Sequence, residues 1–218
     1  MAVSMLAGCQ NANVDPEEPE QPDEPTSSAT YAEMLKSELT GSAKAMVTPV
    51  ANADLDAALK NAVDKYFDYD SGFPTTPGYD GDRFIKYDDL ADYRNDRVGD
   101  AVINAVKADF DTITSLGEVD ENDKAHQTKT KSAVEVYALP ASTSDAYTLE
   151  MLAEKIDGAT SNLPDEGGYD GLNEDKPNYD YDYTVAVSIE TRTVTFAGVE
   201  MGVKYVAFMM TNNVTEKA

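Results

Sequence analysis

Residues 183–190 read Tyr-Thr-Val-Ala-Val-Ser-Ile-Glu, and residues 203–210 read Val-Lys-Tyr-Val-Ala-Phe-Met-Met. The first stretch alternates in polarity, which is the period of a β-strand with one face toward solvent. The second stretch is apolar on both faces and is typical of a central strand. Val194 and Phe196 continue the pattern beyond a turn that we expect at Thr191-Arg192. The carboxyl-terminal segment therefore predicts most of a small sheet.

The chain before this sheet is patterned mainly for helices. Thr30-x-x-Glu33 has the form of a capping box, which marks the start of a helix. Apolar residues at helical spacing predict helices over residues 31–47, 52–67, 88–116 and 145–157, with a β-like stretch at 132–139. Glycine and proline predict loops over 68–86 and 162–182.

Helices first and strands mostly last imply an α+β fold in a single domain over residues 30–218. We expect about four helices, mostly in the amino-terminal half. They should pack on one face of a small antiparallel sheet of three to four strands, formed mainly by the carboxyl-terminal segment.

The amino terminus carries a short motif, Leu6-Ala7-Gly8-Cys9, after an apolar run. This motif resembles the lipobox of bacterial lipoproteins. The resemblance implies that residues 1–8 are the remnant of a signal peptide and that Cys9 receives a diacylglycerol after cleavage. Because no basic segment precedes the apolar run, we expect the true translation start to lie upstream of Met1.

Residues 9–29 predict a tether between that lipid and the folded domain. Prolines stand at positions 16, 19, 22 and 25 among acidic residues, and this spacing matches the threefold period of polyproline II. A polyproline ligand for a partner's groove is the alternative interpretation. An aspartate after the cysteine would resemble the signal that retains lipoproteins of enteric bacteria in the inner membrane, but Gln10 stands there. The resemblance therefore implies a cell-envelope protein of the outer membrane where the cell has one.

Net charge limits the classes of partner. The chain has 41 acidic and 17 basic residues, a formal net charge of −24. Such a charge repels phosphate backbones, so we expect no nucleic-acid partner, and its self-repulsion favours a monomer. Cys9 is the one cysteine in the sequence, so no disulfide forms within the chain.

Aspartates recur beside tyrosines in the acidic segments of the chain. Three Asp-x-Asp pairs have a spacing that a hard cation such as calcium uses, and their members are Asp68, Asp70, Asp80, Asp82, Asp180 and Asp182. None of the pairs completes an EF-hand. Solvated acidic loops are the alternative interpretation of the same pattern.

The neighbouring tyrosines are candidate binding residues: Tyr69, Tyr79, Tyr169, Tyr179 and Tyr181. Tyrosine combines a flat apolar face with a hydroxyl group, so these side chains suit a glycan or a protein partner. Equally, the rings can fold back over the sheet.

No familiar catalytic motif occurs, and the single histidine, His126, lies in a polar stretch without apolar periodicity. Our leading hypothesis is a non-enzymatic envelope lipoprotein, a binding module without a certain cofactor, with calcium as the candidate ion. The alternative hypothesis is an envelope hydrolase of the glycosidase kind that uses paired carboxylates.

Overall fold

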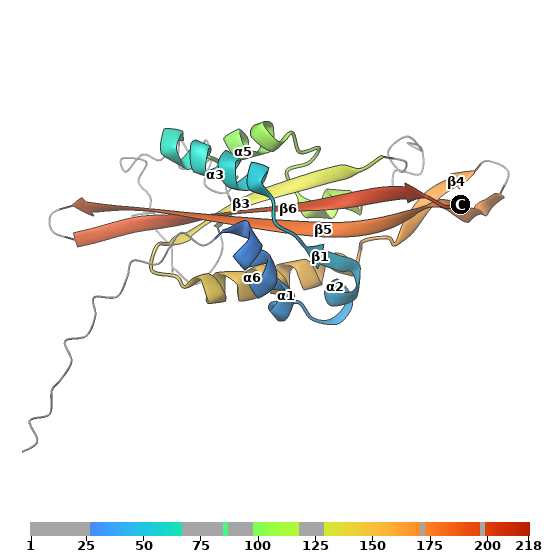
Figure 1. Ribbon diagram of the computed structural model, residues 1–218, viewed down its shortest axis with the longest axis horizontal. Coiled ribbons are helices and arrows are strands. Elements are labelled where there is room, and N and C mark those ends of the chain that lie inside the picture. Colours follow the sequence, from blue (N-terminus) through green and yellow to red (C-terminus); the bar gives the residue numbers. More distant parts are fainter. Residues whose placement is uncertain (1–26, 67–84, 87–97, 118–128, 171–172, 197–198) are drawn as a thin grey trace, which may run out of the picture.

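The computed structural model describes residues 27–66, 85–86, 98–117, 129–170, 173–196 and 199–218. The described residues form a six-stranded sheet with helices on both faces (Figure 1). This arrangement confirms the α+β class, and it confirms that most helices precede the strands that build most of the sheet.

Two long strands form the centre of the sheet. β5 (Asn173–Phe196) and β6 (Val199–Glu216) pair antiparallel without a register shift from Tyr179↔Glu216 to Phe196↔Val199. The turn expected at Thr191-Arg192 is therefore wrong. Both residues pair within the ladder, because alternation of side chains continues through them into Val194.

Shorter strands complete the sheet in the order β1-β5-β6-β3-β2, with β4 added to β5. The antiparallel members are β2 (Ile85–Lys86), β3 (Lys131–Pro140) and β4 (Glu166–Asp170), whereas β1 (Val47–Pro49) runs parallel to β5. The sheet thus roughly matches the small antiparallel sheet that the sequence predicts, and β1 adds a parallel edge that was not expected.

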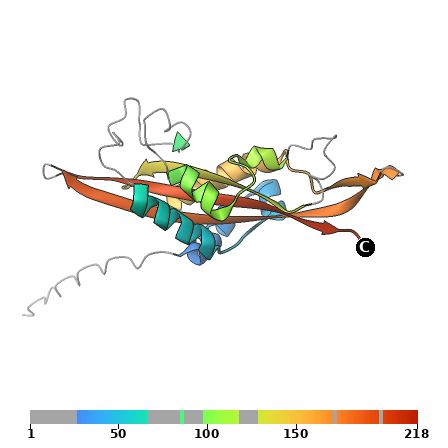
Figure 2. The same ribbon diagram turned by 90° about the horizontal axis from the view of Figure 1, so that it is seen from above.

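Helices cover both faces of the sheet, so the expectation of one covered face is wrong. One face carries α1 (Ser28–Glu38), α2 (Gly41–Met46) and α6 (Asp145–Thr160), and the other carries α3 (Ala53–Tyr66) and α5 (Val98–Val106) (Figures 1 and 2). Along β6, Val206 and Phe208 face the first group, and Tyr205 and Ala207 face the second. A strand that is apolar on both sides needs a cover on both sides.

The helix expected over 31–47 is two helices and a strand. α1 begins at Ser28, ahead of the predicted capping box, and Ser27 at its N-cap makes no side-chain cap bond. The chain leaves the helical conformation at Leu39 and Thr40, where Asp157 of α6 accepts both the Thr40 hydroxyl (2.5 Å) and the Thr40 N–H (3.3 Å). Contacts with another helix thus override the local apolar period.

The helix expected over 88–116 is also interrupted. Residues 88–97 lie outside the described residues, and α5 ends at Val106. The N–H groups of Asp109 and Phe110 donate to Ser132 O of β3, at 2.9 and 3.1 Å, before a 3-10 turn, η2 (Ile113–Leu116). Pairing with the edge of β3 replaces the helical bonds of this segment.

The loop expected over 162–182 is instead a hairpin of β4 and the first part of β5. Tyrosine rings lie directly on two glycines of β4: an added Cβ at Gly167 would stand 1.9 Å from Tyr181 Oη, and one at Gly168 would stand 2.3 Å from Tyr179 Cδ2. Gly168 also has a positive φ of 67°. Glycine signals a loop in sequence, but here it gives aromatic rings room to pack on a strand.

Three predicted elements are confirmed. The predicted second helix corresponds to α3, whose first turn is capped by Asn52 Oδ1 through the Leu55 N–H at 3.0 Å. The stretch at 132–139 corresponds to β3, and the predicted last helix corresponds to α6, which continues past Gly158 to Thr160. The signal remnant 1–8 and residues 9–26 of the expected tether lie outside the described residues.

Tyr183 of β5 predicts a loss of stability at alkaline pH. Its hydroxyl donates to Pro164 O at 2.8 Å, and its side chain is almost fully buried. Burial raises the pKa of this phenol above its ordinary value, so only the unfolded state ionises near pH 10. The contribution of this phenol to the free energy of unfolding is therefore complete below pH 10. Above pH 10 it should fall by about 1.4 kcal/mol per pH unit.

Urea denaturation between pH 8 and pH 11 measures this effect. We expect Tyr183→Phe to lower the free energy of unfolding by about 1 kcal/mol at neutral pH, because the hydrogen bond to Pro164 O is lost. Above pH 10 the free energy of unfolding of this variant should fall less steeply with pH than that of the wild-type protein. If the free energy of unfolding fell equally steeply with pH in the two proteins, ionisation of Tyr183 would not be the cause of the loss.

Candidate functional site

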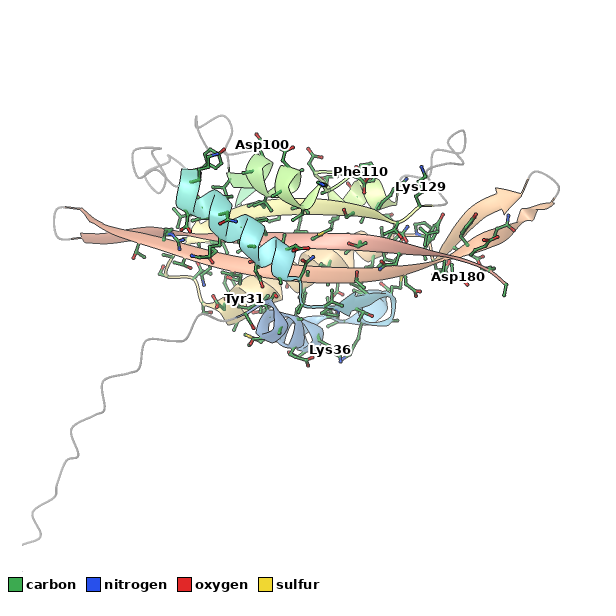
Figure 3. The ribbon with its side chains drawn as sticks, turned by 45° about the horizontal axis from the view of Figure 1, so that its top comes forward. Tyr31, Lys36, Asp100, Phe110, Lys129 and Asp180 are labelled. Carbon is green, nitrogen blue, oxygen red and sulfur yellow. The ribbon has the colours of Figure 1, made fainter. Side chains whose placement is uncertain are left out.

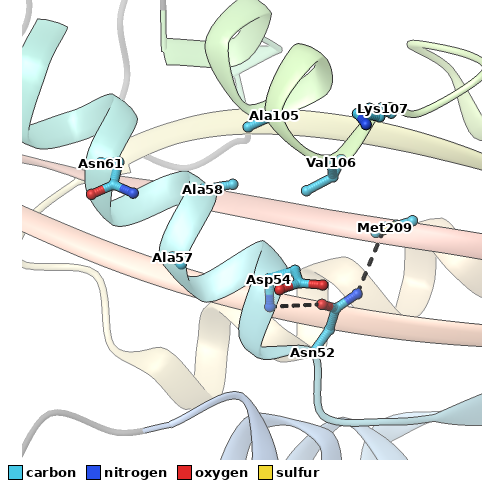
Figure 4. A pocket seen from close by; sticks show the side chains of 9 residues that line it. All are labelled: Asn52, Asp54, Ala57, Ala58, Asn61, Ala105, Val106, Lys107 and Met209. Carbon is cyan, nitrogen blue, oxygen red and sulfur yellow. Dashed lines mark hydrogen bonds between the residues drawn. The ribbon is translucent and has the colours of Figure 1, made fainter.

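An open pocket of about 510 Å³ lies on the sheet face that carries α3 and α5 (Figure 4). Met209 of β6 lines its floor, and residues of α3 and of the end of α5 line its walls. The apolar part of the lining consists of Ala57, Ala58, Ala105, Val106 and Met209. Its polar part consists of Asn52, Asp54, Asn61 and Lys107.

The start of α3 positions one polar wall of the pocket. Asn52 Oδ1 accepts the N–H groups of Asp54 (3.1 Å) and Leu55 (3.0 Å), and Asn52 Nδ2 lies 3.6 Å from Met209 Sδ. These contacts hold the Asn52 side-chain amide between the first turn of α3 and Met209 on the pocket floor. Asp54, in the first turn of the helix, is exposed at the pocket.

The end of α5 forms the opposite wall. Lys107 is the one non-glycine residue with a positive φ (55°) among the described residues. The Ala108 N–H donates back to Ile103 O at 3.2 Å, which makes this a Schellman-type end with lysine at the position that glycine usually occupies. A strained residue that lines a pocket is a common feature of binding sites.

Lys107→Gly should stabilise the protein by about 1 kcal/mol, because glycine reaches the left-handed region without the steric cost of a Cβ. Lys107→Ala is the matched control: it removes the same charge and keeps the Cβ, so we expect a change below about 0.5 kcal/mol. Urea denaturation of the wild-type protein and the two variants measures both changes in the free energy of unfolding. A gain from alanine equal to that from glycine would show that the charge, rather than the backbone, is unfavourable here.

A buried carboxylate on the other face holds the segment that follows α5. Glu135 of β3 is 2% exposed. Its Oε1 accepts the Ile113 N–H (2.9 Å) and the Thr112 hydroxyl (3.2 Å), and its Oε2 accepts the Tyr137 hydroxyl beside Lys155 Nζ at 3.6 Å. Both oxygens are thus used to tie η2 and α6 to the sheet, which is a structural role.

The tyrosines predicted to bind a partner take different places. Tyr181 is 8% exposed and packs in the core with Tyr183, and Tyr179 is partly buried beside it. Tyr169 belongs to β4, opposite Pro177. Tyr69 and Tyr79 lie outside the described residues. Tyr179 and Tyr181 therefore pack against the core, and binding of a partner by these tyrosines stays a prediction.

Among the predicted calcium ligands, Asp180 and Asp182 are exposed residues of β5. Asp180 pairs with Glu166 of β4, at the end of the sheet that carries β4 (Figure 3). Asp180 Oδ1 is 3.2 Å from Lys217 Nζ, which also donates to Glu166 at 2.5 Å. These two carboxylates raise the pKa of Lys217, with the Glu166 hydrogen bond as the larger cause. An ammonium group therefore already neutralises part of this cluster.

The other predicted ligands, Asp68, Asp70, Asp80 and Asp82, lie outside the described residues, as do Cys9 and His126. Within the described ranges, no group of three or more His, Cys, Asp or Glu side chains is placed to hold a metal ion. Calcium binding and the hydrolase alternative both stay predictions.

Sequence reasoning placed Asn52 and Asp54 at a helix start but did not identify them as pocket residues. A pocket depends on how two helices and a strand come together, and the helical period of α3 gives no sign of which neighbour it meets. Nothing in the sequence marked Lys107 as a pocket residue, because the apolar periodicity predicted a helix that continued through this position.

No helix among the described residues is both long and apolar enough to cross a membrane. Comparison of the chain with protein-family models, curated proteins and solved structures finds no match.

Proposed function

We propose that this chain is a lipid-anchored binding protein of the cell envelope and that it takes a small amphipathic ligand in the pocket between α3 and α5. The pocket is the observation that carries the binding part of the proposal. The resemblance of residues 6–9 to a lipobox carries the anchoring part.

The composition of the pocket supports binding of a small molecule. Its volume of about 510 Å³ falls in the range of ligand sites in proteins. Such sites combine an apolar lining with a few polar groups that orient the ligand. Here Met209 and Val106 supply apolar surface, while Asp54 and Lys107 supply opposite charges from the two walls.

Electrostatics favours a ligand with a positive end. The net charge of −24 attracts cations over a longer range than any single side chain, and Asp54 is exposed at the pocket. The apolar lining suits a short aliphatic body. The ligand class that fits both conditions is a small aliphatic amine, such as an amino-acid or peptide fragment whose ammonium group is free.

Four leucine derivatives test this assignment, because they share one apolar body and differ in charge: leucine amide, leucine, N-acetyl-leucine amide and N-acetyl-leucine. Amide chemical shifts in 1H–15N NMR spectra report where each one binds. We expect shifts at Ala57, Ala105 and Lys107, with dissociation constants of about 1 mM for such small molecules. At low salt the cationic leucine amide should bind about three times more tightly than the anionic N-acetyl-leucine.

Ala57→Phe should abolish these shifts, because Ala57 is exposed on the pocket wall and a ring there fills the space. Ala53→Phe is the matched control, since Ala53 is an exposed alanine of the same helix outside the lining. If none of the four molecules shifts the pocket amides, or if Ala57→Phe leaves binding unchanged, the pocket is not a ligand site.

The position of the pocket is compatible with a tether at the amino terminus. The described chain enters the fold at Ser28, whose Oγ accepts the Asn52 N–H at 3.2 Å. Asn52 itself lines the pocket. The predicted tether therefore joins the domain next to the proposed ligand site.

Lipidation is tested on the protein made in a bacterial host with a basic signal segment restored ahead of Met1, and then extracted from the membranes. Since the lipid is attached to the sulfur of Cys9, we expect a mass that corresponds to a chain starting at Cys9 with acyl groups attached. Cys9→Ala should move the protein from the membrane fraction to the soluble fraction. An intact Met1 with a free thiol would overturn the anchoring part alone and leave the pocket experiment unaffected.

A further inference from the structure

β5 has an outer edge that only part of the described chain covers. β4 pairs with this edge as far as Asp180, and β1 pairs with Tyr183–Val185. No described strand pairs with it from residue 186 to residue 196. Ala186, Val187 and Ser188 are buried, whereas Thr191 and Thr193 are exposed. The available edge is thus the part beyond Ser188.

The direction of the backbone groups along this edge follows from one hydrogen bond. The Val50 N–H donates to Val185 O at 2.8 Å, so the Val185 carbonyl points away from β6. Backbone groups alternate in direction along a strand, and β5 has no bulge against β6. The N–H and C=O groups of Ile189, Thr191 and Thr193 therefore also point outward, ready for another strand.

We propose that this edge pairs with the same edge of a second copy of the chain, antiparallel and with the twofold axis at Thr191. Unpaired strand edges of high β-propensity are templates for such pairing. Residues 189–196 read Ile-Glu-Thr-Arg-Thr-Val-Thr-Phe, which is rich in β-branched side chains.

Charge selects the register of the pairing. With the axis at Thr191, each Glu190 lies opposite Arg192 of the partner subunit, and both pairs are non-hydrogen-bonded positions, where side chains approach most closely. An axis at Glu190 or at Arg192 would place like charges opposite each other. Within one chain, Arg192 Nη1 already lies 3.0 Å from Glu190 Oε2, so the two side chains share one face of the sheet.

A second copy fits this edge better than the chain's own amino-terminal segment. That segment has proline at every third position from 16 to 25, and proline has no N–H to donate to a ladder. The net charge of −24 opposes association at long range, which is why the sequence favours a monomer. At this edge, however, Arg192 offsets part of the negative charge of Glu190 and Asp64, which both bind it, and salt screens the rest.

Sedimentation equilibrium of the full chain tests the proposal directly. At about 100 µM protein and physiological salt we expect a mass twice the monomer's 23.6 kDa. Glu190→Arg and Arg192→Glu should each raise the dissociation constant at least about tenfold, and the double variant should restore it to within about threefold. Thermal melting of each variant verifies that it is folded. A monomeric wild-type chain, or a double variant no better than the single ones, would overturn the proposal.

Cross-linking tests the register in a Cys9→Ala background. Thr191→Cys places two thiols opposite each other with Cα atoms about 5.5 Å apart, within disulfide range. Thr193→Cys is the matched control, because Thr193 and the partner's Thr193 are offset by four residues, about 13 Å. We expect mild oxidation to give a covalent dimer for the first variant only. Equal cross-linking of both variants, or none for Thr191→Cys, would overturn the assigned axis.

Discussion

The antiparallel pairing of β5 with β6 is the constraint on which the other elements depend. An uninterrupted register from Tyr179↔Glu216 to Phe196↔Val199 fixes which side chains face each side of the sheet. A slip of one residue would turn Phe208 toward α3 and Tyr205 toward α6. Because both faces of β6 are apolar, both need a helical cover, and the three-layer arrangement follows from that need.

Buried polar contacts then fix where the covering elements lie. On one face, Lys204 of β6 binds the carboxylate of Asp145 at the start of α6, and the Tyr31 hydroxyl of α1 donates to the same carboxylate at 3.1 Å. Glu135 does the same for η2. Hydrophobic burial is non-directional, whereas these contacts have a defined geometry, and they specify a single position for each element.

The proposed ligand site and the proposed dimer edge both arise where this covering is incomplete. Small residues on the facing sides of α3 and α5, such as Ala57 and Ala105, leave a pocket above Met209. At the far end of β5, the outer edge has no strand neighbour in the described chain beyond Val185. Asp64 of α3 binds Arg192 close to that edge, so α3 contributes to both features.

Sequence pattern alone was enough to predict the elements whose local pattern agrees with their surroundings. The alternation along β5, the two apolar faces of β6, and the capped start of α3 at Asn52 are local properties that a strand or a helix needs wherever it lies. Where these patterns stop depends on contacts with distant parts of the chain. Asp157 binds Thr40 in the break between α1 and α2, and Ser132 O accepts the backbone N–H groups that follow α5. Two tyrosine side chains pack on Gly167 and Gly168 of β4. Each partner lies far away in the sequence, so no local period records it, and the pocket residues were missed for the same reason.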